Sequence, residues 1–71
     1  MGRQPLYQTI VADIQNSIAT GALRPGQKLP SITELSAQYD CSETVVKTAL
    51  TVLRTTGAVE GHQGKGVFVA G

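Results

Sequence analysis

Two helix-start signals that stand close together, at Ser31 and Ser42, constrain the fold of this chain most strongly. Ser31 and Glu34 match a capping box, in which the serine covers free amides of the first helical turn and the glutamate reaches back. Ser42 is a second residue of a type favoured at the N-cap. We therefore predict a short helix from residue 31 to near Asp40, a tight turn, and a further helix that begins at Ser42.

The segment after Ser42 has the periodicity of a helix with one buried face. Its apolar residues follow the i, i+3, i+4, i+7 spacing and end before Gly57, namely Val46, Ala49, Leu50 and Leu53. At about 100° per residue, the opposite face carries Thr44, Thr48, Thr51 and Thr55, with Lys47 beside them. The pattern predicts a helix over residues 42–56 whose outer face is small, polar and almost uncharged.

The flanking segments complete an α+β fold of three helices and a small antiparallel hairpin. Residues 6–18 carry one apolar stripe at helical spacing, and Gly21 and Pro25 end that helix. A strand of two or three residues fits around Lys28 and Leu29. Residues 58–62 and 67–69 are typical of two strands joined by a glycine-rich tip. We expect one winged helix-turn-helix domain over residues 1–71.

Size and charge limit what the chain can do. A chain of 71 residues with 41% hydrophobic content can form one core but not two. The net charge of +1 is low for a nucleic-acid-binding protein, so DNA binding requires the basic side chains to gather on one face. The single Cys41, with no signal peptide and no apolar run near membrane length, favours a cytoplasmic protein without a membrane partner.

The chemistry of the outer face of helix 42–56 suits double-stranded DNA. A helix enters a major groove about 12 Å wide only if its outer side chains are small, and threonines can donate, accept and offer a methyl to thymine. Gly64 and Gly66 allow the hairpin tip, with Lys65, to approach phosphates or the neighbouring groove. Each feature alone also fits a solvated surface or an ordinary turn. A winged-helix module that binds proteins, with little DNA affinity, is the alternative.

Three segments, in this order and spacing, resemble the N-terminal DNA-binding domain of the GntR family of bacterial regulators. They are residues 5–10 (PLYQTI), 18–31 (IATGALRPGQKLPS) and 63–69 (QGKGVFV). The resemblance implies sequence-specific binding of an operator by a transcriptional regulator of repressor type, as a homodimer on DNA. It also implies a larger effector-binding domain, which this sequence does not include.

The resemblance further implies which residues contact DNA. Family members usually carry an arginine early in the second helix and another just after the third helix cap, where this chain has Thr33 and Glu43. Both departures remove positive charge and imply weaker affinity or an altered operator. The predicted contact residues are Ser31, Thr33, Ser42, Glu43, Thr44, Val45, Lys47, Thr48, Gln63, Gly64 and Lys65.

No catalytic residue, metal site or cofactor is predicted. His62 is the only histidine and has no second ligand nearby in the sequence. Asp13 and Asp40 lack the paired spacing of an acid–base site. We expect Cys41 to be a buried thiol, and Tyr7 and Tyr39 to pack in or beside the core.

Overall fold

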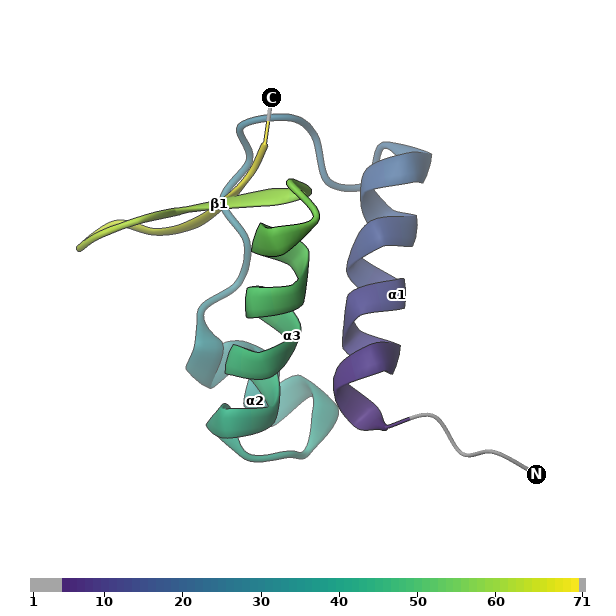
Figure 1. Ribbon diagram of the computed structural model, residues 1–71, viewed down its shortest axis with the longest axis vertical. Coiled ribbons are helices and arrows are strands. Elements are labelled where there is room, and N and C mark those ends of the chain that lie inside the picture. The colour runs from purple at the N-terminus through teal and green to yellow at the C-terminus, as the bar shows by residue number, and fades with distance from the viewer. Residues whose placement is uncertain (1–4, 71) are drawn as a thin grey trace.

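The computed structural model describes residues 5–70 and contains three helices and one two-stranded antiparallel sheet. The helices are α1 (Leu6–Thr20), α2 (Ile32–Tyr39) and α3 (Glu43–Thr55), and the strands are β1 (Val59–His62) and β2 (Gly66–Val69). In Figure 1, α1 and α3 lie side by side, α2 lies at the base of α3, and the hairpin projects away from the helices. The predicted α+β fold with three helices and a hairpin is confirmed.

The predicted helix boundaries are explained by local hydrogen bonds. Ser31 Oγ accepts from the amide of Glu34 at 3.0 Å while Glu34 Oε1 accepts from the amide of Ser31 at 3.0 Å, which is the predicted capping box. Ser42 caps α3 through the amide of Val45. Asp40 ends α2 in the left-handed conformation, with φ 52°, a conformation that Asp tolerates better than most residues.

The strands differ slightly from the prediction. β1 begins at Val59, one residue later than expected, and β2 begins at Gly66, one residue earlier. The pairing extends to the end of the hairpin because Gly66 pairs with His62. The short strand predicted around Lys28 is present as a bridge between Lys28 and Phe68. The amide of Leu29 donates to the Val67 carbonyl at 2.8 Å, so this loop is fixed along the outer edge of β2.

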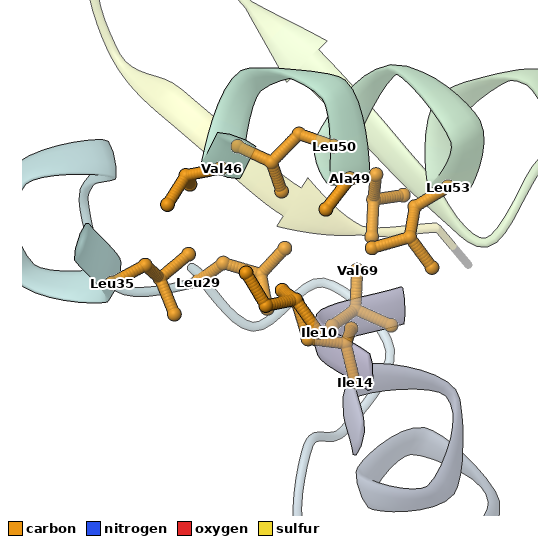
Figure 2. Packing of buried hydrophobic residues seen from close by; sticks show 10 residues of the cluster. Ile10, Ile14, Leu29, Leu35, Val46, Ala49, Leu50, Leu53 and Val69 are labelled. Atoms are coloured by element: carbon orange, nitrogen blue, oxygen red, sulfur yellow. The ribbon is translucent and has the colours of Figure 1, made fainter. Parts of the chain in front are cut away.

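One apolar core joins every element of the fold. Figure 2 shows the buried side chains converging from α1, α2, α3, β2 and the loop before α2. The core residues are Ile10, Ile14, Leu29, Leu35, Val46, Ala49, Leu50, Leu53, Val59 and Val69. All four residues of the predicted α3 stripe are among them. Because α3 buries this face, its threonine face is turned to solvent.

The side chains expected at the edge of the core behave largely as predicted. Tyr7, Tyr39 and Cys41 are half-buried and pack against the core, so the Cys41 thiol is partly rather than fully buried. Tyr39 also has a polar partner, since its hydroxyl donates to Asp13 Oδ2 at 2.8 Å. This hydrogen bond connects α2 to α1.

Candidate nucleic-acid interface

The residues predicted to contact DNA lie at three places in the structure. Ser31 and Thr33 stand at the start of α2, and residues 63–65 form the turn of the hairpin. The residues at the start of α3 are Ser42, Glu43, Thr44, Val45, Lys47 and Thr48. All of them are exposed except Val45, which is half-buried and packs against the core. Figure 1 shows the hairpin projecting beyond the side of α3. We call this hairpin, residues 59–69, the wing.

The starts of α2 and α3 are joined by a hydrogen bond that the sequence did not reveal. Thr33 Oγ1 donates to Glu43 Oε2 at 3.0 Å across the turn between the helices. At both of these positions the family resemblance implies an arginine. The two departures therefore form one polar pair, and the Glu43 carboxylate is held against α2 rather than left free.

The threonines on the outer face of α3 bond to their own helix. Thr48, Thr51 and Thr55 each donate the hydroxyl proton to the backbone carbonyl four residues earlier, at 2.9 to 3.0 Å. The outward groups of these side chains are then a methyl and the free lone pairs of the oxygen. Such a surface can contact a thymine methyl or accept from a base amino group.

The wing ends in a tight turn that requires glycine. Gly64 has φ 76°, a conformation that a β-carbon would strain. The amide of Lys65 donates to the His62 carbonyl at 3.0 Å and closes the turn. The Lys65 side chain is exposed at the tip, as predicted for a basic wing.

His62 has structural neighbours within the wing. Its ring lies edge-on to Phe68, with a centroid distance of 5.2 Å. Its Nε2 is 3.6 Å from Glu60 Oε2, which is an ion pair only when the histidine is protonated. Within residues 5–70, no group of three or more side chains of the metal-ligating types lies close enough together to hold a metal ion.

A cleft beside α3 brings the predicted Lys65 together with two basic residues that sequence reasoning missed, Lys28 and Arg54. The cleft has a volume of about 640 Å³ and lies between the wing, the loop before α2 and the start of α2. Three of the five basic residues within positions 5–70 line it, namely Lys28, Arg54 and Lys65. These three basic side chains therefore gather on one side of the molecule, as DNA binding requires for a chain of low net charge. Arg3 lies outside the described residues.

A signal for this cleft is present in the sequence. Gly61 interrupts a predicted strand, and an isolated glycine in a strand often marks a place where another group approaches the backbone closely. In the structure that group is the Arg54 guanidinium. The strand pairing and the last turn of α3 had to be placed together before the contact became visible.

Comparison with known proteins identifies the same architecture elsewhere. The family model described as "Bacterial regulatory proteins, gntR family" matches residues 6–69. The mannosyl-D-glycerate transport/metabolism system repressor of Escherichia coli K12 is 38% identical over 69 residues, which is 97% of this chain and 29% of that protein. The probable fructoselysine utilization operon transcriptional repressor of the same organism is 36% identical over 93% of this chain and 27% of its own length.

Solved structures show the same fold. The DNA-binding domain of AraR in complex with operator ORX1 has a TM-score of 0.93 and 32% identity, over 96% of this chain and 82% of that chain. A transcriptional regulator from Oenococcus oeni has a TM-score of 0.94 and 30% identity, over 100% of this chain and 59% of that one. The chain spans less than a third of the length of the curated relatives named above. None of the described helices is long and apolar enough to cross a membrane.

Proposed function

The chain belongs to the GntR family of bacterial regulatory proteins, and from this premise we propose that it binds operator DNA as the reading domain of a transcriptional regulator. The N-terminal half of α3 enters the major groove, and the wing contacts the adjacent groove or backbone. Residues 1–71 act as one DNA-binding domain, and the contact residues are those named above. The AraR domain solved with operator DNA supports this assignment, since it shares the fold and about a third of the sequence.

One observation carries the proposal. The buried stripe of α3 turns its small threonine face to solvent, and the lysine of the wing tip and the basic cleft lie on the flank of the same helix. A helix that reads base edges needs small outer side chains, and the phosphates on either side need cations. Both requirements are met on one side of this molecule.

The proposal also covers the type of regulation, the cellular location and the assembly on DNA. We infer that the regulator is a repressor in the cytoplasm, that two copies bind one operator, and that an effector acts through a further domain. The relatives support repression, since both the mannosyl-D-glycerate and the fructoselysine proteins are named as repressors. Two copies on half-sites about one helical turn apart are the common arrangement for helix-turn-helix proteins.

The test is a titration of labelled duplex DNA at several salt concentrations. We expect log affinity to fall with log salt with a slope of roughly −2 to −5, from about three to five phosphate contacts per copy. Selection from a random duplex pool is expected to return one preferred sequence. An affinity for duplex DNA that does not change with salt, together with no enriched sequence, would instead support the protein-binding module. Glu43 and the net charge of +1 are the features that favour this alternative.

A further inference from the structure

We propose that the cleft between the wing and the start of α2 holds one phosphate of the DNA backbone, with Arg54 and Lys28 as its ligands. This inference rests on the proposed function, since it assigns to the DNA interface two residues that lie outside the start of α2, the start of α3 and the wing tip. The partner is the phosphodiester backbone beside the major groove that α3 occupies. The contact carries no sequence information of its own.

The lining of the cleft suits an anion. Lys28, Arg54 and Lys65 line it, and no Asp or Glu does among the described residues. Leu29 and Leu50 form an apolar part of the wall, and both side chains are buried in the core. Low-dielectric walls focus the field of the cations toward the opening.

The Arg54 guanidinium rests directly on the backbone of β1. A β-carbon built on Gly61 would lie 3.3 Å from Arg54 Cζ and 3.4 Å from Nε, so the glycine leaves the space that the guanidinium occupies. No carboxylate lies within ion-pair distance of Arg54 among residues 5–70. The group is therefore positioned against the wing and free of an internal anion. A planar guanidinium can bind a phosphate through two parallel hydrogen bonds.

Lys28 approaches the same cleft from the side of β2, whereas Arg54 lies against β1. The bridge to Phe68 fixes its backbone, and its Cε lies 2.9 Å from where a β-carbon on Gly66 would stand. The Lys28 charge also contributes to lowering the pKa of Glu34, after the larger effects of the hydrogen bonds from Ser31. Lys28 lines the cleft together with Ser31 and Thr33 at the start of α2. No carboxylate lies within ion-pair distance of Lys28 among residues 5–70, which leaves Lys28 able to meet an external anion.

The first experiment removes the two charges. Arg54→Gln and Lys28→Gln, singly and together, are compared with Arg24→Gln, which removes one charge, as each single variant does, from an exposed residue outside the cleft. Affinity for a duplex of random sequence is measured over a salt series. We expect the double variant to lose affinity for all sequences and to reduce the magnitude of the salt slope by about one. A slope equal to that of the Arg24→Gln protein would overturn the proposal.

The second experiment keeps every charge and fills the space that the Arg54 guanidinium occupies. Gly61→Val suits a strand and needs no positive φ, but its side chain occupies the space of the Arg54 head group. We expect a loss of affinity of several fold in the unmodified chain and none in the Arg54→Gln chain. An equal loss in both would show that the substitution acts on the wing itself and would overturn the role of Arg54. Circular dichroism confirms that each variant is folded.

Different results would contradict the proposed function and the phosphate site. If the unmodified chain binds no duplex at any salt concentration, the proposed function is wrong and the phosphate site falls with it. If the unmodified chain binds duplex DNA but the Arg54 and Lys28 variants match the Arg24 control, only the phosphate site is wrong.

Discussion

At the scale of single residues, the pair formed by Thr33 and Glu43 sets the charge at the start of α3, the helix that we propose enters the major groove. The Glu43 carboxylate accepts a hydrogen bond from Thr33 at 3.0 Å. It stands in the first turn of α3, where a negative charge interacts favourably with the helix dipole and stabilises the helix. An acid there repels phosphates but can accept from a cytosine amino group. The hydrogen bond leaves the second carboxylate oxygen available for that role.

The substitution Glu43→Arg tests which effect dominates. We expect tighter binding to random duplex and a steeper salt slope, because a repelling charge becomes an attracting one. We also expect a slightly lower Tm, since an acid in the first helical turn contributes about 0.3 to 1 kcal/mol. Duplex titration and thermal unfolding measure the two.

The matched control is Glu43→Gln, which removes the charge but keeps a side-chain oxygen that Thr33 can reach. Its salt slope should lie between those of the parent and Glu43→Arg. Weaker binding of Glu43→Arg to random duplex would mean that Glu43 is not a repulsive element, and the docking proposed for α3 would have to be abandoned.

Tyr39 gives a second residue-level prediction, concerning alkaline stability. Burial, and then the hydrogen bond to Asp13 and its charge, raise the pKa of Tyr39 to about 12. The free phenol titrates near pH 10, so the unfolded chain ionises first. The stabilising effect is present below pH 10 and is lost as the pH rises toward 12. We expect the Tm of the parent to fall more over this interval than the Tm of Tyr39→Phe, and equal falls would contradict the assignment.

At the scale of elements, the proposed docking gives α3 and the wing different roles in DNA binding. α3 presents threonines whose hydroxyl protons are used within the helix, so it meets the groove with methyl groups and acceptor lone pairs. The wing presents Lys65 on a turn closed by glycine at positive φ. In the proposed docking, the first surface distinguishes bases, and the second adds charge without distinguishing them.

The substitution Lys65→Ala tests this division. We expect weaker binding by about the same factor on every duplex sequence, and a salt slope smaller in magnitude by about one, because a wing-tip lysine meets phosphate or groove potential. Arg24→Ala is the charge-matched control away from the wing. If only one operator variant lost affinity, Lys65 would be reading bases.

At the scale of the whole molecule, a single small core supports all of these surfaces. Leu53 is completely buried, and a Leu-to-Ala change at such a site costs about 2 to 5 kcal/mol. A core of this size supplies only about 3 to 5 kcal/mol. We therefore expect Leu53→Ala to be largely unfolded at 25 °C by circular dichroism and urea titration. Leu6→Ala, at a side chain 38% exposed, should stay folded, and a folded Leu53→Ala protein would mean a stronger core than we estimate.

The assembly on DNA is the second prediction at this scale. The apolar residues of the helices are largely used in the core, and Leu6 is the only large hydrophobic residue exposed among positions 5–70. We expect a monomer or weak dimer at micromolar concentration, with DNA bringing two copies together. Sedimentation with and without an operator duplex measures this. A tight dimer without DNA would point to α1 or the terminal strand as an interface.

The sequence by itself determined the three helices, their caps and the wing, because these depend on local signals. The capping box at Ser31, the buried stripe of α3 and the glycine turn at Gly64 each involve residues only a few positions apart. Local hydrogen bonds and periodicity are therefore sufficient to predict them.

Only the tertiary structure decided which distant residues share a surface. The hydrogen bond between Thr33 and Glu43 crosses the turn between helices, and the contact of Arg54 with Gly61 needs the last turn of α3 packed against β1. Lys28 reaches the same cleft because the loop before α2 pairs with β2. Such contacts depend on how packing of the core orients whole elements, and no short stretch of sequence contains that information.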